Sequence, residues 1–224
     1  MNVLLFGATG MVGRGVLREC LLDPGVVRVR SVGRTSTGYS HPKLEETILP
    51  DVGDLAAREA EVSGFDACFF CLGVSSVGMK EEDYRRLTYD LTLAVARRLA
   101  RLNPGMTFIY VSGTGTDSTE KGRTMWARVK GKTENDLLRL PFRAVYLFRP
   151  GAIEPLHGIR SRTPLFNALY TVLKPFIPLL RKLFPAHIVT TEEVGRAMIN
   201  AARSGAPRAV VEIADIRRLA TPTV

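Results

Sequence analysis

A glycine-rich turn near the start of the chain constrains the fold more than any other feature. Residues 2–6 form an apolar run of strand length, three glycines spaced three residues apart follow it, and residues 11–22 show helical spacing of apolar side chains. In such a strand-turn-helix unit the first glycine permits a tight turn, the second lets the backbone approach a pyrophosphate, and the third lets the helix pack on the sheet. The amide groups that begin the helix then point at the phosphates. The residues predicted to contact a dinucleotide here are Gly7, Thr9, Gly10, Met11, Val12 and Gly13.

The rest of the chain alternates apolar runs of strand length with segments of helical period, which is typical of βαβ units and a mostly parallel sheet. The clearest helix spans residues 81–102, between an acidic start and a basic end. No repeat and no linker rich in Gly, Ser or Pro divides the chain. We therefore expect one α/β domain over residues 1–224, a three-layer, doubly wound parallel sheet. The predicted strands are 2–6, 27–32, 47–49, 67–72, 107–111, 144–148 and 209–213, and the other predicted helices are 11–22, 126–138 and 192–203.

The residues after the second predicted strand bear on which dinucleotide fits. An acid in this place accepts hydrogen bonds from the adenosine ribose, whereas a cation binds the 2′-phosphate of NADP. Residues 31–35 hold no carboxylate, and Arg34 lies 21 residues after Gly13. The sequence therefore favours NADP over NAD as the cofactor, although Arg34 is also compatible with a solvated surface position.

Together these motifs resemble the extended and atypical short-chain dehydrogenases/reductases, the superfamily that includes the NAD-dependent epimerases and dehydratases. The Gly-x-x-Gly-x-x-Gly turn is spaced like theirs, and the resemblance covers nearly the whole chain. Within the superfamily, residues 130–134 are most similar to a branch that includes the oxidoreductase-like Tat-interacting protein. The resemblance implies a Rossmann-like fold, an adenine contact by Asp54 and Leu55, a nicotinamide-side loop of Cys71, Leu72 and Gly73, and a turn near the nicotinamide that contains Pro150 and Gly151.

The expected catalytic tyrosine is replaced by a tryptophan. Members of the superfamily that transfer hydride use Tyr-x-x-x-Lys, and this chain has Trp126 and Lys130 at that spacing. The resemblance implies that Lys130 binds the nicotinamide ribose and that Ser112 polarises a carbonyl. The indole of Trp126 donates a hydrogen bond but exchanges no proton near neutral pH, so it does not replace the tyrosine as an acid or base. Trp126 is then a stacking wall of the substrate pocket.

Three explanations of the missing tyrosine stay open. Tyr84 or Tyr89 folds into the site from the start of the long helix, although packing is the more common role of such aromatics. Alternatively, Lys130, Thr114 or a water molecule takes over the proton transfer, or the protein binds its cofactor without turnover. The leading hypothesis is an NADP-dependent oxidoreductase or epimerase that acts on a small carbonyl or hydroxyl compound. The rival is a catalytically silent NADP-binding sensor or interaction protein.

The formal net charge of +9 lies in the second part of the chain, since residues 1–120 carry −2 and residues 121–224 carry +11. Such a charge attracts an anionic cofactor to one face. The resemblance implies that residues 151–191 form a small C-terminal substrate cap. The apolar and basic character of residues 163–185 also permits a weak peripheral membrane contact. Nucleic acid is not an expected partner, because no reader motif occurs and aromatic residues do not alternate with cations.

The three cysteines exclude a disulfide framework and favour a reducing compartment. Cys68 and Cys71 have the spacing of a metal-binding pair, but residues three apart on a strand point to opposite faces, and the histidines match no ligand spacing. No metal site is therefore expected. The chain shows no secretory leader, and its longest stretch without a charged residue, 102–116, is too short for a spanning helix. These features predict a cytoplasmic protein without a membrane span.

Overall fold

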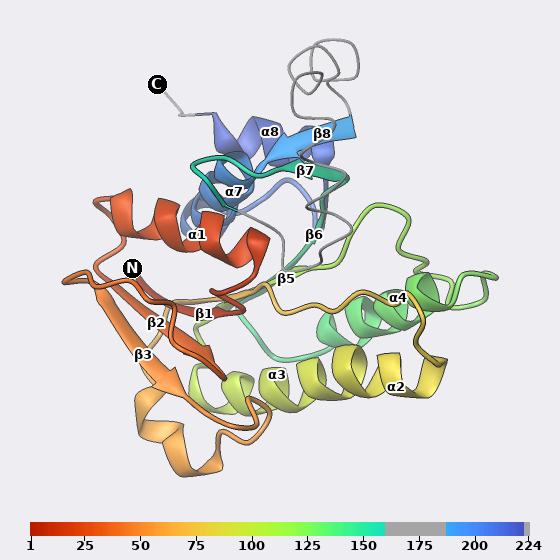
Figure 1. Ribbon diagram of the computed structural model, residues 1–224, viewed down its shortest axis with the longest axis horizontal. Coiled ribbons are helices and arrows are strands. Elements are labelled where there is room, and N and C mark those ends of the chain that lie inside the picture. The colour runs from red at the N-terminus through yellow and green to blue at the C-terminus, as the bar shows by residue number, and fades with distance from the viewer. Residues whose placement is uncertain (160–186, 222–224) are drawn as a thin grey trace.

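The computed structural model describes residues 1–159 and 187–221, which are organised around a seven-stranded sheet (Figure 1). The strand order is β3-β2-β1-β4-β5-β6-β9, and every neighbouring pair is parallel. The order reverses between β1 and β4, which is the topological switch point of a doubly wound sheet. The strands are β1 (Asn2–Phe6), β2 (Arg28–Gly33), β3 (Leu44–Ile48), β4 (Ala67–Phe70), β5 (Thr107–Val111), β6 (Ala144–Arg149) and β9 (Val210–Glu212).

Helices cover both faces of the sheet (Figure 1). One layer holds α1 (Met11–Leu22), α7 (Thr191–Ser204) and α8 (Ile213–Ala220). The other holds α4 (Met125–Leu137) and one continuous long helix made of α2 (Glu81–Arg85), the π-helical turn η2 (Arg86–Asp90) and α3 (Leu91–Leu102). A short 3₁₀ segment, η1 (Ala56–Glu61), follows β3. The predicted three-layer, Rossmann-like α/β fold is confirmed.

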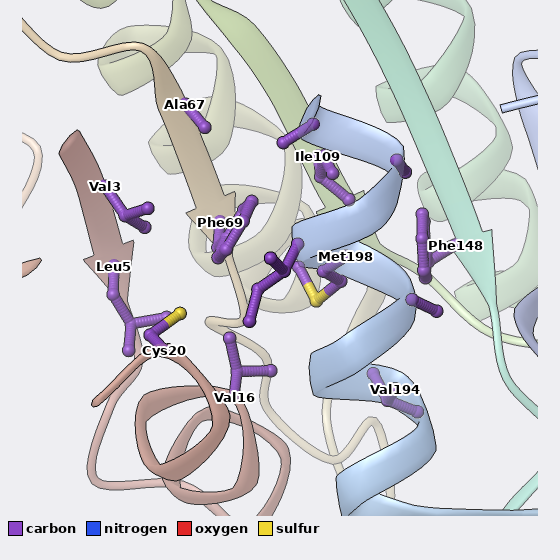
Figure 2. Packing of buried hydrophobic residues seen from close by; sticks show 14 of the residues in the cluster. Val3, Leu5, Val16, Cys20, Ala67, Phe69, Ile109, Phe148, Val194 and Met198 are labelled. Carbon is purple, nitrogen blue, oxygen red and sulfur yellow. The ribbon is translucent and has the colours of Figure 1, made fainter. Parts of the chain in front are cut away.

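Two hydrophobic clusters lie on the two faces of the sheet, because alternate strand residues point in opposite directions. Val3 and Leu5 of β1 belong to the cluster under α1 and α7, whereas Leu4 and Phe6 belong to the cluster under α3. Figure 2 shows the first cluster around Met198 of α7. Burial on both faces explains why these strands read as continuous apolar runs in the sequence.

The predicted elements agree with the structure where local periodicity is strong, and they differ near short segments. The boundaries of β1, β5 and α1 coincide with the predicted ranges. The predicted final strand, 209–213, ends at Glu212, because Glu212 and Asp215 form a reciprocal capping box that begins α8. Neither α8 nor the small parallel pair of β7 (Ala152–Glu154) and β8 (Ile188–Thr190) was expected from the sequence.

The predicted membrane-contact segment, 163–185, and most of the predicted cap, 151–191, lie outside the described residues. The described part of the cap region is residues 151–159 and 187–191. It contains the β7–β8 pair, which aligns Ala152 with Ile188. Within residues 1–159 and 187–221, no helix combines the length and apolarity that crossing a membrane requires. The single-domain organisation stays a prediction.

Candidate cofactor and active site

The glycine turn joins β1 to α1 at the carboxyl edge of the sheet, beside β4. Gly7 has a φ of +83°, and a Cβ atom there would lie 2.7 Å from the carbonyl group of Cys71. A Cβ atom on Gly13 would lie 2.1 Å from the carbonyl oxygen of Gly7. By contrast, the nearest atom to a Cβ on Gly10 is the Gly7 oxygen at 3.4 Å. Close packing therefore excludes a side chain at Gly7 and at Gly13. At Gly10 the backbone has room on the side where a Cβ atom would lie.

The N-terminus of α1 has the properties of an anion site. Gly10 is its N-cap residue, no side chain caps it, and no acid lies in its first turn. The amides of Met11, Val12 and Gly13 belong to the first helical turn, whose N–H groups have no partner within the helix. Together with the helix dipole these donors favour a negatively charged group. Thr9 is half-buried in the same turn.

At the expected adenosine end, Arg34 and Asp54 are exposed. Arg34 forms no ion pair with an acid among residues 1–159 and 187–221. Leu55 is fully buried in the cluster under α3, so its side chain is part of the core. The carboxylate of Glu46, which sequence reasoning missed, accepts hydrogen bonds from Ser36 and from the amide of Thr37, both at 2.7 Å.

Glu46 is therefore already engaged within this loop. Burial raises its pKa, but the hydrogen bonds from Ser36 and Thr37 outweigh burial and lower the pKa below its usual value. Glu46 thus connects β3 to the loop after β2, through hydrogen bonds to Ser36 and Thr37, two and three residues after Arg34. The sequence of the loop alone gave no sign of it, because Glu46 comes from the neighbouring strand.

At the expected nicotinamide end, the loop after β4 continues beside β1. The amide of Cys71 donates to the carbonyl oxygen of Phe6 at 2.9 Å, and Leu72 and Gly73 follow with increasing exposure. Burial strongly raises the pKa of the Cys71 thiol, which is neutral at physiological pH. Cys68 and Cys71 contact opposite hydrophobic clusters, as predicted from their spacing.

Pro150 and Gly151 follow β6. Pro150 is buried, and its carbonyl oxygen accepts the amide of Thr114 at 3.0 Å. A Cβ atom on Gly151 would lie 2.7 Å from the carbonyl oxygen of His187. Gly151 is therefore required by the close approach of the chain that enters β8.

A buried network lies at the ends of β5 and β6. Glu134 of α4 is 1% exposed, and Arg149 contacts both of its carboxylate oxygens, one of them from Nε at 3.0 Å. Ser112 is a buried residue, 6% exposed. Its Oγ atom lies 2.5 Å from Glu134 Oε1 and 3.2 Å from the carbonyl oxygen of Phe148. Since a hydroxyl has one proton and a carboxylate is the stronger acceptor, Ser112 donates to Glu134.

Glu134 ends the sequence segment 130–134, and Arg149 directly precedes the turn of Pro150 and Gly151, but neither residue was predicted to have a role. The available signal was the spacing of Lys130 and Glu134, which puts both on the same face of a helix, one turn apart. The position of Arg149 opposite this face follows only from the pairing of β5 with β6.

Lys130 contacts the main chain of Ser112, whereas Glu134 contacts the side chain of Ser112. Its ammonium group donates to the carbonyl oxygen of Ser112. Burial lowers the pKa of Lys130 to about 8, while the nearby carboxylate of Glu134 acts in the opposite direction. Lys130 therefore changes its protonation state near physiological pH, unlike an exposed lysine.

Trp126 and Thr114 lie at the accessible side of this network. Trp126 is half-buried one turn before Lys130, and its ring lies over Gly115, where a Cβ atom would be 3.5 Å from the indole. Thr114 is exposed and donates to the carbonyl oxygen of Arg149 at 3.1 Å. The loop after β5 thus presents an exposed hydroxyl next to an indole face, while the Ser112 hydroxyl points into the protein.

The two tyrosines considered as substitutes are engaged elsewhere. Tyr84 is 2% exposed, and burial raises the pKa of its hydroxyl. The Tyr89 hydroxyl donates to Asp136 of α4 at 2.6 Å. Both residues therefore pack the long helix, which is the more common role of aromatics in this position.

The structure shows three free cysteines. Within its described residues no three His, Cys, Asp or Glu side chains are grouped as metal ligands. His157, the histidine nearest in sequence to the turn after β6, contacts Glu192 at 3.0 Å.

Comparison with known proteins finds curated relatives of modest sequence identity and solved structures of the same fold. No protein-family model matches it. Among curated proteins, fmp52 of Emericella nidulans is 28% identical over 159 residues and FMP52 of Eremothecium gossypii is 30% identical over 155 residues. Each alignment covers 68% of this chain and 66% of the relative, so the matched part is just under two thirds of those proteins.

Solved structures share the fold at low sequence identity. The Bordetella bronchiseptica enzyme WbmF, solved with NAD⁺, has a TM-score of 0.67 and 19% identity, over 98% of this chain and 76% of that one. The UDP-N-acetylglucosamine 4-epimerase of Methanobrevibacter ruminantium has a TM-score of 0.66 and 14% identity, over 93% of this chain and 74% of that one. The sheet order and the glycine turn define a Rossmann-type fold. These solved structures confirm the fold that the resemblance to the extended short-chain dehydrogenases/reductases implied. The similarity of this chain to the Tat-interacting branch stays a prediction.

The predicted cytoplasmic localisation is contradicted, because these relatives are named as mitochondrial proteins. The cytoplasmic prediction rests on the lack of a basic segment and cleavage site of the secretory type and on the three cysteines. Neither feature bears on mitochondrial targeting, which depends on amphipathic segments rich in arginine.

Proposed function

We propose that this protein binds NADP and acts as an oxidoreductase or epimerase on a small carbonyl or hydroxyl compound. The observation that carries the proposal is the uncapped start of α1 at the switch point between β1 and β4. Lys130 of α4 contacts the carbonyl oxygen of Ser112, the residue that follows β5. That WbmF was solved with NAD⁺ supports a dinucleotide in this fold. In this proposal residues 151–191 cap the substrate.

The preference for NADP rests on Arg34. It is exposed at the end of β2, where it is free to pair with a 2′-phosphate. Binding constants for NADP and NAD, measured by calorimetry in the wild type and in Arg34→Ala, test this step. We expect Arg34→Ala to weaken NADP binding by about tenfold, because a charge-assisted hydrogen bond is lost, and to leave NAD binding unchanged.

Arg97→Ala is the matched control, because Arg97 is exposed on α3 and its loss makes the same change in net charge. An equal loss of NADP affinity in both variants would point to net charge alone. Equal discrimination between NADP and NAD in the wild type and in Arg34→Ala would remove Arg34 from the site.

A bound nicotinamide would supply or accept the hydride. The protein binds the cofactor, orients the substrate and exchanges a proton with it. Lys130 binds the nicotinamide ribose, and with a pKa of about 8 it is also able to exchange a proton near neutral pH. Either Ser112 or Thr114 orients the substrate oxygen. Thr114 is exposed, so its hydroxyl is able to turn from the carbonyl oxygen of Arg149 to the substrate oxygen, whereas Ser112 is buried and hydrogen-bonded to Glu134.

A second candidate function, an NADP-binding sensor or interaction protein without turnover, is favoured by one observation. Trp126 occupies the tyrosine position, while Tyr84 and Tyr89 are held by packing and by Asp136. Reduction of a panel of aldehydes and ketones with NADPH separates the two functions. A rise of about 10² or more in Trp126→Tyr, but not in Trp126→Phe, with NADPH binding unchanged, would identify the native protein as a binder.

A further inference from the structure

Two residues of α4 fix the same residue of the loop after β5. Glu134 accepts the hydroxyl of Ser112, and Lys130 donates to the carbonyl oxygen of Ser112. Lys130 and Glu134 are one helical turn apart, so Ser112 is held from its side chain and from its main chain at once. The Ser112 amide also donates to the carbonyl oxygen of Phe148 at 2.9 Å, so strand pairing and Glu134 together hold the residue whose carbonyl oxygen accepts from Lys130.

Arg149 connects this carboxylate to the neighbouring elements. Besides both oxygens of Glu134, it contacts Ser118 Oγ at 2.6 Å and Glu212 at 3.6 Å. A buried carboxylate is stable only when its lone pairs are hydrogen-bonded and its charge is compensated. Arg149 meets this need from the end of β6, so the buried carboxylate of Glu134 has a guanidinium partner in a position that is closed to solvent.

Of the groups around Lys130, Glu134 is the one whose charge favours the protonated form of the lysine. Glu134 is the charged group that acts on Lys130 in the described structure, and Arg149 lies behind it. Tyr110 of β5 is buried next to Glu134, and burial raises the pKa of its hydroxyl, which keeps it neutral. Removing the charge of Glu134 therefore leaves the buried ammonium group with no compensating anion.

We propose that Glu134 is a positioning residue for Lys130: through Ser112 it fixes the place of the ammonium group, and through its charge it keeps that group protonated for binding of the cofactor ribose. Glu134 touches neither cofactor nor substrate in this assignment. The assignment rests on the proposed function only for the identity of the ligand that Lys130 binds.

The protonation of Lys130 is measurable without a substrate or a cofactor. Competitive labelling of the full chain with acetic anhydride over pH 6–10, followed by peptide mass spectrometry, gives the pKa of Lys130 in each variant. We expect about 8 in the wild type and about one unit less in Glu134→Gln, which keeps the size of the side chain but loses its charge. Asp136→Asn is the matched control, because Asp136 lies on the same helix and pairs with Tyr89 and Lys132 instead. An unchanged pKa of Lys130 in Glu134→Gln would overturn the proposal.

Binding of NADPH at two pH values separates positioning from a merely structural role. With the pKa of Lys130 lowered by one unit, the protonated fraction at pH 8 falls from about one half to about one tenth, so affinity falls roughly fivefold, while at pH 6 it is nearly unchanged. An equal loss at both pH values would show a structural role only and would contradict the proposal. A wild type that binds no NADPH would contradict the proposed function, and the labelling would still decide the role of Glu134.

Glu134→Gln leaves Arg149 without its main partner, so a second variant guards against loss of folding. Glu134→Gln combined with Arg149→Met removes both charges of the pair. We expect this double variant to fold and to show the same lowered pKa of Lys130. A wild-type pKa in the folded double variant would overturn the assignment of Glu134.

Discussion

Gly13 and Gly7 are packed so closely that a Cβ atom on Gly13 would lie 2.1 Å from the Gly7 carbonyl oxygen. This contact brings the start of α1 against the end of β1 and leaves the first amides of the helix at the carboxyl edge of the sheet. The Gly7 carbonyl also accepts the amide of Gly10 at 2.9 Å, so the turn is fixed from both sides. The proposed dinucleotide site and close helix packing therefore depend on the same contact.

We predict that Gly13→Ala lowers the free energy of unfolding by about 1–3 kcal/mol and weakens NADPH binding at least tenfold, because the backbone atoms of Gly7 cannot move aside without displacing α1. Gly105→Ala is the control, since no atom lies within 4 Å of a Cβ atom there. Urea unfolding and calorimetry measure the two effects. Normal stability and normal binding in Gly13→Ala would show that the turn adapts.

The depressed pKa of Lys130 predicts a pH dependence of stability. Lys130 loses its proton near pH 8 in the folded protein and near its usual value of 10.5 in the unfolded chain. Between these values the unfolded state binds more protons, so the contribution of Lys130 to the free energy of unfolding rises as the pH rises. Below pH 8 both states are protonated and the contribution is constant.

The measurement compares urea unfolding of the wild type and of Lys130→Met between pH 7 and 10.5. Other groups titrate in both proteins, so their difference isolates Lys130. We expect the stability of the wild type relative to Lys130→Met to be flat below pH 8 and to increase above it. A constant difference across the range would mean that Lys130 has an ordinary pKa.

The sequence predicted the elements whose signals are local. The boundaries of β1, α1 and β5 follow from apolar runs and glycines that lie within a few residues of each other. The short strands β7 and β8 have three residues each and pair across more than thirty residues of chain, so no local pattern announces them. The apolar run 209–213 predicts a strand over Ile213, whereas in the structure the capping box of Glu212 and Asp215 begins α8 at Ile213.

Some residues of the candidate site were likewise predictable from local sequence patterns, and others were not. The glycine turn and the i, i+4 pair of Trp126 and Lys130 are local, and the structure places each at the carboxyl edge of the sheet. The partner of the Ser112 hydroxyl was not predictable, because Glu134 reaches it only through the packing of α4 against β5 and β6. The burial of the Leu55 side chain also depends on the fold, since the residue follows an exposed acid, Asp54.

The two hydroxyls near the site are predicted to have different effects when removed. In the proposed function the exposed hydroxyl of Thr114 turns from the carbonyl oxygen of Arg149 to the substrate oxygen. Thr114→Val is therefore expected to lower turnover of a carbonyl compound with NADPH by about 10²-fold. Ser112→Ala lowers the free energy of unfolding by about 1–3 kcal/mol, because the buried carboxylate of Glu134 loses a hydrogen bond. Steady-state kinetics and urea unfolding of both variants test this division. A Ser112→Ala variant that loses as much turnover as Thr114→Val while remaining stable would return the substrate contact to Ser112.

Two arginine–carboxylate pairs of α4 differ in burial and are predicted to differ in energy. Arg149 pairs with Glu134, whose side chain is 1% exposed, whereas Arg139 pairs with Asp136 at 2.7 Å and is itself 76% exposed. We expect Arg149→Met to lower the free energy of unfolding by about 3–5 kcal/mol, because it leaves a buried charge uncompensated. Arg139→Met should change it by only about 0–1 kcal/mol, since solvent screens an exposed pair. Urea unfolding at pH 7 measures both, and equal effects of the two substitutions would show that the Glu134 carboxylate is not held by Arg149.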